Sequence, residues 1–147
     1  LVLLIAPLAV GVTRRVKVDR LDQVIDEAVT QLIAMVKEQG GTVAGAAFGI
    51  YHGTINAEDD GPIEICVPVA GRVQGNRDAG FRKLAGGKAA AVMLHGKQCD
   101  FPAVLKGYDA VVDWIKQNDH KVAQSPREVW IGQNGPDMKL EIVWPFR

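Results

Sequence analysis

Glu128 and Trp130 are separated by one residue in the segment 127–131 of this 147-residue chain. Side chains two positions apart on a β-strand share one face, so both would border the same space. A carboxylate beside aromatic rings suits a delocalised organic cation. Each ring adds cation–π attraction of about 0.5–2 kcal/mol, and the carboxylate adds charge whose effect grows as water leaves. The alternative is an exposed Glu128 beside Arg127 with no special role.

A second segment, residues 46–51, also ends in an aromatic residue. On this predicted strand Phe48 and Ile50 share one face, which has enough bulk to cover a helix. Gly49 and Tyr51 share the other face, which is hollow with one large ring at its edge. Ordinary packing at a strand end is the alternative role of this ring.

The two segments belong to an internal repeat. Residues 8–69 and 88–146 carry similar patterns in the same order. Each copy opens with a short apolar run, residues 8–12 and residues 88–92, that predicts a buried strand. Each later element recurs after a nearly constant offset of 77–80 residues. Four ordered matches at one offset indicate a duplication.

An amphipathic helix follows in each copy. The predicted apolar stripes are Leu21, Val24, Ile25, Ala28, Leu32 and Met35 in the first helix, and Phe101, Val104, Leu105, Tyr108, Val112 and Ile115 in the second. Asp19 and Asp100 are the predicted N-caps, with Pro102 tolerated in the first turn of the second helix. We expect the first helix to end at Gly40-Gly41 and the second at Asn118-Asp119.

Two strands joined by a turn complete each copy. Turn-forming residues gather at 59–62 and again at 134–137. The last strand opens with the motif Glu-Ile-x-x-Pro at Glu64 and again at Glu141. This recurrence suggests a shared role, for which bonding to a neighbouring backbone or basic side chain is the structural alternative.

The predicted fold class is therefore α+β, with duplicated β-α-β-β units around a pseudo-two-fold axis. We expect an antiparallel sheet with two long helices on one side and a ligand cleft between the repeats. Residues 1–147 would form a single domain. Its parts are repeat one at about 1–69, a glycine-rich linker at about 70–87 with a short strand near 81–84, and repeat two at about 88–147.

The repeat places Glu128 opposite Gly49 and pairs Trp130 with Tyr51, so one acid and two rings would face a common space. Tyr108 lies on the apolar stripe of the second helix, and its hydroxyl needs a partner if it is buried. The full set of candidate ligand-binding residues is Tyr51, Glu128, Trp130, Phe48, Tyr108, Glu141 and Trp144.

Composition argues against several other classes of function. Lys+Arg and Asp+Glu both number 17, so the chain lacks the net positive charge that attracts nucleic acid backbones. The apolar start, residues 1–12, is too short to span a membrane and predicts a buried strand. Cys66 and Cys99 form no CxxC motif and fit a reducing cytoplasm. The scattered histidines and the absence of a nucleotide-binding motif predict neither a metal nor a cofactor.

Several of these motifs together resemble one known family. They read FGIYHG, DGPIEICVPV, PREVWIG and LEIVWPF, with His95-Gly96 leading into the helix that carries Tyr108. In this order they resemble the GyrI-like superfamily over nearly the whole chain. Its relatives include effector-binding domains of MerR-type and AraC-type multidrug-responsive regulators. Stand-alone members bind drugs, inhibit DNA gyrase or hydrolyse cyclopropane-bearing genotoxins.

The resemblance implies roles for particular residues. In the family an acidic residue of the Arg-Glu-Val-aromatic strand is central to the ligand site, and here that residue is Glu128, followed by Trp130. By the same resemblance, Tyr51, the aromatic residue of the equivalent strand in the first copy, is expected to line the wall of the ligand site. Where other members read Gly-Pro-Tyr, this chain reads Gln98-Cys99-Asp100.

The resemblance favours a stand-alone cytoplasmic protein that binds bulky aromatic, often cationic compounds for drug sequestration or sensing. One alternative is a hydrolase of electrophilic xenobiotics, in which Glu128 activates water and Tyr51 donates to the leaving group. Another is a gyrase-inhibitor-like interaction module. DNA binding would need an upstream domain or a partner.

Overall fold

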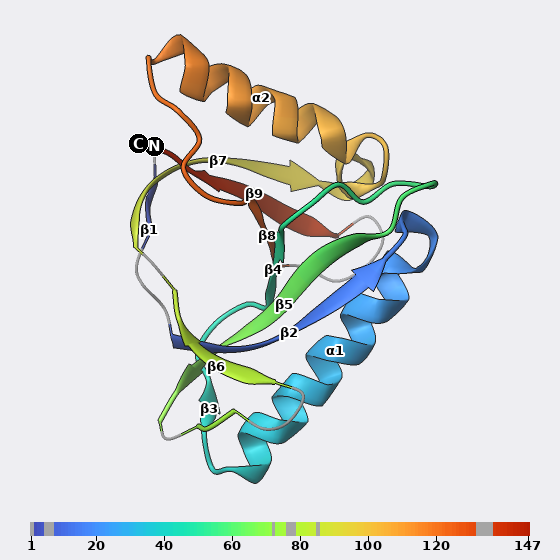
Figure 1. Ribbon diagram of the computed structural model, residues 1–147, viewed down its shortest axis with the longest axis vertical. Helices are drawn as coiled ribbons and strands as arrows, with labels where there is room; N and C mark the ends of the chain where they lie inside the picture. The colour runs from blue at the N-terminus through green and yellow to red at the C-terminus, as the bar shows by residue number, and fades with distance from the viewer. Residues whose placement is uncertain (1, 5–7, 72, 76–78, 85, 132–136) are drawn as a thin grey trace. The chain divides into compact units, whose positions relative to one another are not determined.

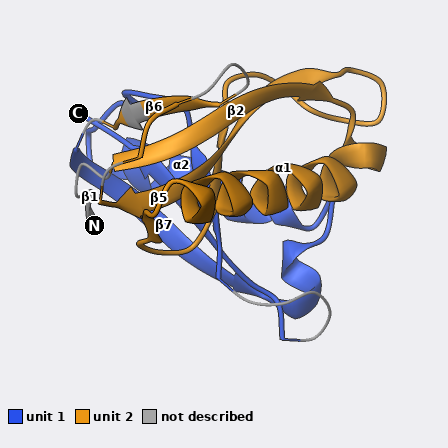
Figure 2. Ribbon diagram, turned by 90° about the horizontal axis from the view of Figure 1, so that it is seen from below, with its two compact units in different colours: residues 1–5, 86–147 blue, residues 6–85 orange. Residues whose placement is uncertain are grey.

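The computed structural model describes residues 2–4, 8–71, 73–75, 79–84, 86–131 and 137–147. The chain falls into two compact units, residues 6–85 and residues 1–5 with 86–147 (Figure 2). The architecture is α+β with antiparallel strands and two α-helices, which confirms the predicted fold class. No helix in the described part of the chain combines the length and the hydrophobicity needed to cross a membrane.

The unit of residues 6–85 is an antiparallel sheet with one long helix along it (Figure 1). Its elements are β2 (Leu8–Val16), α1 (Val18–Glu38), β3 (Thr42–Val43), β4 (Phe48–Tyr51), β5 (Gly61–Ala70) and β6 (Gly80–Lys83). The strands pair in the order β4-β5-β2-β6, and β3 pairs with β5. Helix α1 contacts β5 and β2, and it buries Ala28, Leu32, Met35 and Val36. Strand β6 confirms the strand predicted near residues 81–84.

The second unit repeats this plan around α2 (Figure 1). Its elements are β1 (Val2–Leu4), β7 (Gly87–His95), the 3-10 helix η1 (Gly96–Cys99), α2 (Val104–Gln117), β8 (Arg127–Trp130) and β9 (Lys139–Pro145). The strands pair in the order β1-β7-β9-β8, and α2 contacts β7 and β9. Strand β1 at the start of the chain pairs with β7, so it belongs to the sheet of the second repeat.

Strand register confirms the duplication. In the first copy Gly11 pairs with Cys66, and in the second Ala91 pairs with Val143. These pairs are related by the offsets of 80 and 77 residues seen in the sequence. The strand pairs on the other edge of β5 and β9 agree as well. Cys66 also pairs with Phe48, and Val143 also pairs with Arg127, which lies 79 positions after Phe48. Equivalent positions therefore have equivalent neighbours.

Both helices end near the predicted residues, and both end in the same hydrogen-bonded turn. At the end of α1, Gly41 N–H donates to the Val36 carbonyl at 3.0 Å, and Gly40 has a φ of 76°. At the end of α2, His120 N–H donates to the Ile115 carbonyl at 3.0 Å, and Asp119 has a φ of 60°. This is the Schellman arrangement, in which one residue adopts the left-handed conformation.

Both predicted N-caps are wrong. Helix α1 begins at Val18 with Lys17 as its N-cap, so Asp19 lies inside the first turn, where its negative charge still favours the helix dipole. Helix α2 begins at Val104 with Ala103 as its N-cap. A residue before proline disfavours the helical conformation, and Pro102 therefore delays the start of the helix beyond Asp100.

The predicted apolar stripe of α2 is partly wrong. Phe101 and Leu105 are exposed, at 43% and 46% of their surface. The buried residues are Val104, Gly107, Val111 and Ile115. The face that α2 turns toward the sheet is therefore centred on Gly107 and Val111.

The first predicted turn is shorter than expected, because Gly61 and Pro62 already belong to β5. Pro62 lies near the start of this strand, where proline is tolerated, and its carbonyl accepts a hydrogen bond from His52 N–H at 3.1 Å. The equivalent turn at residues 134–137 falls mostly outside the described residues.

Candidate functional site

Strand β8 places Glu128 and Trp130 on the sheet face that α2 covers. Glu128 pairs with Ile142 of β9, and Trp130 pairs with Leu140. Ile142 and Leu140 belong to the apolar cluster that contains Val111 of α2. Directly paired residues of antiparallel strands share a face. The face of β8 that carries Glu128 and Trp130 is therefore the one that meets the helix.

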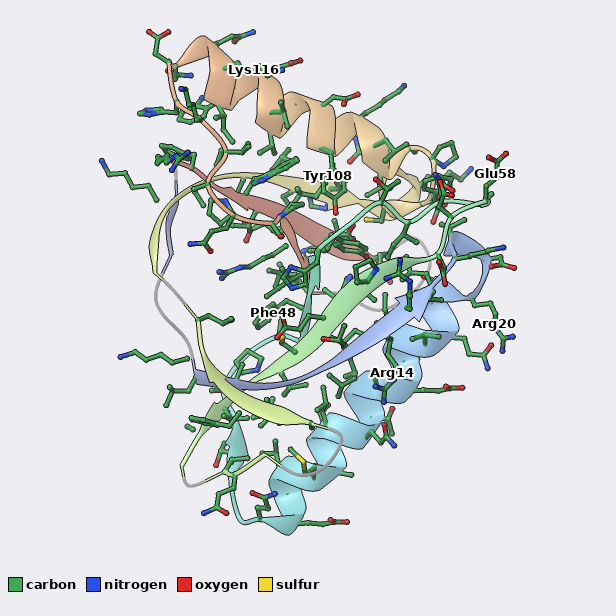
Figure 3. All side chains as sticks on the ribbon, viewed as in Figure 1. Arg14, Arg20, Phe48, Glu58, Tyr108 and Lys116 are labelled. Carbon is green, nitrogen blue, oxygen red and sulfur yellow. The ribbon has the colours of Figure 1, made fainter. Side chains whose placement is uncertain are left out.

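Glu128 is buried and bonded to the helix above it. Glu128 is only 8% exposed, and its Oε2 accepts a hydrogen bond from the Tyr108 hydroxyl. Figure 3 shows Tyr108 on the side of α2 that faces the strands. Glu128 thus provides the partner that a partly buried tyrosine hydroxyl requires. The expectation of an exposed Glu128, part of the alternative considered from the sequence, is wrong because Glu128 is buried. Arg127 is also buried and lies on the opposite face.

Gly107 allows α2 to approach the sheet at the position next to Tyr108. A Cβ at Gly107 would lie 2.8 Å from Ile142 Cδ1 and 2.9 Å from Leu94 Cδ1. A side chain here would require the terminal methyl groups of Ile142 and Leu94 to shift or the helix to move outward. The missing side chain therefore leaves room for Ile142 and Leu94 against α2.

Trp144 contacts the ring of Tyr108. The two ring centroids are 6.1 Å apart, and the planes meet at 83°, an edge-to-face arrangement. The indole Nε1 of Trp144 donates to the carbonyl oxygen of Gln124 at 2.8 Å. On β7 the residue paired with Trp144 is Ala90, whose small side chain leaves room for the indole. Tyr108 therefore has an aromatic neighbour whose orientation is itself fixed.

Cys99 is electrostatically linked to the same group. Burial raises the pKa of the Cys99 thiol, and the negative charges of Asp100 and Glu128 raise it further. The thiol also donates a weak hydrogen bond to the Met138 carbonyl at 3.9 Å.

The two other candidates of this unit lie on opposite faces of the sheet. Trp130 is partly buried and packs against the apolar cluster beneath α2. Glu141 pairs with Val129, so it lies on the face opposite Glu128 and outside the group formed by Glu128, Tyr108 and Trp144.

The remaining candidates lie in the unit of residues 6–85. Tyr51 is partly buried at the end of β4, and Phe48 is buried on the same strand. Glu64 is buried on β5, and its Oε1 lies 2.9 Å from His52 Nε2. Glu64 therefore bonds a neighbouring basic side chain, the structural role considered from the sequence.

Two contributors to the site were missed in the sequence. Gly107 carried a signal, because glycine inside a helix costs about 1 kcal/mol relative to alanine and often marks close packing. Gln124 carried none, because it acts through its backbone carbonyl, which every residue type has.

Comparisons with known proteins agree with this fold. The model of the family described as GyrI-like small molecule binding domain matches residues 7–147. The search of curated proteins finds no match. Among solved structures, the crystal structure of the EcmrR C-terminal domain has a TM-score of 0.84 at 18% identity, covering 99% of this chain and 94% of that one.

Two further structures show the same fold. EcmrR in its cryo-EM complex with DNA also has a TM-score of 0.84 at 18% identity, over 99% of this chain but 56% of the EcmrR chain. SAV2435 bound to tetraphenylphosphonium has a TM-score of 0.64 at 12% identity, over 99% of this chain and 92% of that one. At these identities the likeness concerns the fold alone.

Proposed function

Because the chain belongs to the GyrI-like small-molecule-binding domain family, we propose that it binds bulky aromatic, often cationic compounds. The proposed site is the group formed by Glu128, Tyr108, Trp144 and Trp130, hereafter the Glu128 cluster. Binding would serve sequestration or sensing of such compounds. The two cysteines are both free thiols, which fits a reducing cytoplasm as the place of action.

The burial of Glu128 is the observation that carries the proposal. A carboxylate removed from water attracts an opposite charge more strongly, because less solvent screens the interaction. Aromatic rings around it add apolar contact and cation–π attraction for a delocalised cation. Tyr108 and Trp144 are such rings, and Trp130 lies on the same sheet face as Glu128.

The comparisons support this choice of ligand class. SAV2435, which shares the fold, is bound to tetraphenylphosphonium, a lipophilic cation. The EcmrR complex with DNA supports a role in sensing, but the present chain spans 56% of the EcmrR chain, so DNA binding is not proposed for these residues.

Isothermal titration calorimetry with tetraphenylphosphonium tests the proposal. We expect binding to the unmodified chain and a loss of affinity of about 10- to 100-fold in Glu128→Gln, equal to about 1.4–2.8 kcal/mol. Asp109→Asn is the matched control, because Asp109 is exposed on α2 and its substitution removes the same charge. An affinity that is equal in Glu128→Gln and Asp109→Asn would contradict the assignment of the site, and no binding to the unmodified chain would contradict the ligand class.

A further inference from the structure

The side chain of Tyr108 is held at two places. Its hydroxyl donates to Oε2 of Glu128, so one of the two carboxylate oxygens already has a donor from the protein. Its ring makes an edge-to-face contact with the ring of Trp144. To leave Glu128, the phenol would have to break a hydrogen bond to a charged acceptor and disturb an aromatic contact.

Trp144 is itself held in place through Gln124. The indole Nε1 donates to the Gln124 carbonyl at 2.8 Å. The segment before Gln124 pairs with the C-terminal residues: Lys121 N–H donates to the Arg147 carbonyl at 3.0 Å, and Ala123 N–H donates to the Pro145 carbonyl at 2.9 Å. The acceptor of the indole is therefore fixed to the strand end that carries Trp144, which leaves the indole little freedom to swing away.

We propose that Tyr108, held by Trp144, makes the Glu128 cluster selective for organic cations that lack N–H donors. This inference rests on the proposed function. A quaternary or otherwise fully substituted cation needs charge attraction and aromatic contact, both of which act without a directional hydrogen bond. Such a ligand binds with the bond between Tyr108 and Glu128 intact.

A cation with N–H groups meets a different situation. When it leaves water its N–H groups need acceptors, and a donor left unsatisfied in a buried site weakens binding. To use Oε2 of Glu128, the ligand must share it with the Tyr108 hydroxyl or displace that hydroxyl. Trp144 opposes the displacement. The cluster therefore discriminates by hydrogen-bonding capacity as well as by charge and size.

Two triarylmethane dyes measure this discrimination. Crystal violet carries fully methylated nitrogens, and pararosaniline is the same cation skeleton with N–H groups instead. The observable is the ratio of the two dissociation constants, pararosaniline over crystal violet, measured by calorimetry for each variant. Because a ratio is compared, a general loss of affinity through altered packing cancels.

We expect Tyr108→Phe to lower this ratio by about fivefold to tenfold, because the variant keeps the ring and removes the competing hydroxyl. Trp144→Phe should lower it in the same direction by a smaller factor, since it removes the indole bond to Gln124. Trp114→Phe is the control for the second variant, because Trp114 is an exposed tryptophan on α2, the helix that carries Tyr108. Its ratio should equal that of the unmodified chain.

The possible outcomes separate the inference from the proposed function. If both dyes bind in a manner that depends on Glu128 and Tyr108→Phe leaves the ratio unchanged, the role of Tyr108 is overturned and the binding site stands. If Tyr108→Phe changes the ratio and Trp144→Phe does not, the positioning role of Trp144 is overturned. If neither dye nor tetraphenylphosphonium binds the unmodified chain, the proposed function itself fails.

Discussion

The Tyr108 hydroxyl donates a hydrogen bond to the Glu128 carboxylate, joining α2 to β8 across 20 residues of sequence. The bond gives the buried carboxylate a neutral donor from the helix. In the proposed site, it would also limit which atoms of Glu128 a ligand can use. The proposal therefore makes stability and ligand recognition depend on the same pair of side chains.

Tyr108→Phe should lower the free energy of unfolding by about 1.5–3 kcal/mol, the range for a hydrogen bond to a charged group. Glu128→Gln should cost less, because the amide oxygen can still accept from the hydroxyl. Urea denaturation of both single variants and the double variant gives the coupling energy, expected at about 0.5–3 kcal/mol. Effects that simply add would show that the two side chains do not interact in solution.

The thiol of Cys99 should react with iodoacetamide only at higher pH than an ordinary thiol, because burial, Asp100 and Glu128 raise its pKa. Peptide mapping by mass spectrometry separates it from the buried Cys66. Asp100→Asn and Glu128→Gln should each move the pH profile downward, since each removes a negative charge. A profile that does not respond to Glu128→Gln would place the carboxylate too far from the thiol.

The same shift predicts the direction of a stability change with pH. The folded state holds the Cys99 proton more tightly than the unfolded state does, because the pKa is raised on folding. The contribution is therefore complete below the ordinary thiol pKa and is lost as the pH rises through the raised pKa. Thermal denaturation of Cys99→Ser beside the unmodified chain should show a smaller decline over this alkaline range.

Gly107→Val should lower the free energy of unfolding by about 1–3 kcal/mol, since its Cβ would overlap the Ile142 and Leu94 side chains. It should also weaken the contact between Tyr108 and Glu128 by moving α2 outward. Ala110→Val is the control, because it introduces the same side chain at an exposed position of α2. Equal stabilities of the two variants in chemical denaturation would argue against the close approach.

Asp119→Gly should raise the free energy of unfolding by about 0.5–1 kcal/mol, because glycine adopts a positive φ without the strain of a Cβ. Gly40→Ala at the equivalent end of α1 should lower it by about 1 kcal/mol for the same reason. Differential scanning calorimetry should therefore show shifts of opposite sign. Shifts of the same sign would mean that the two helix ends are not equivalent.

The duplication was readable from the sequence because repeated elements leave repeated patterns. The offset that matched apolar runs also matched pairs such as Gly11 with Cys66 and Ala91 with Val143. Helix ends were readable because a positive φ favours Gly, Asn and Asp. The helix starts were not readable from the sequence, since Asp19 and Asp100 are both good N-caps in isolation. At the second helix, the competing effect of Pro102 acts through the backbone.

For the candidate site, the sequence by itself determined which residues could take part. These are Glu128 and Trp130 on one face of a strand, and a tyrosine on the apolar stripe of a helix. The family pattern marks the acid among them. Tertiary structure alone decided how they meet. The alternation of side chains along a strand sorts residues into two faces, but it does not indicate which of the two faces a helix covers. Helix α2 covers the face of Glu128, and Gly107 lies at its close contact with Ile142 and Leu94. The bond from Tyr108 and the indole fixed by Gln124 follow from that packing.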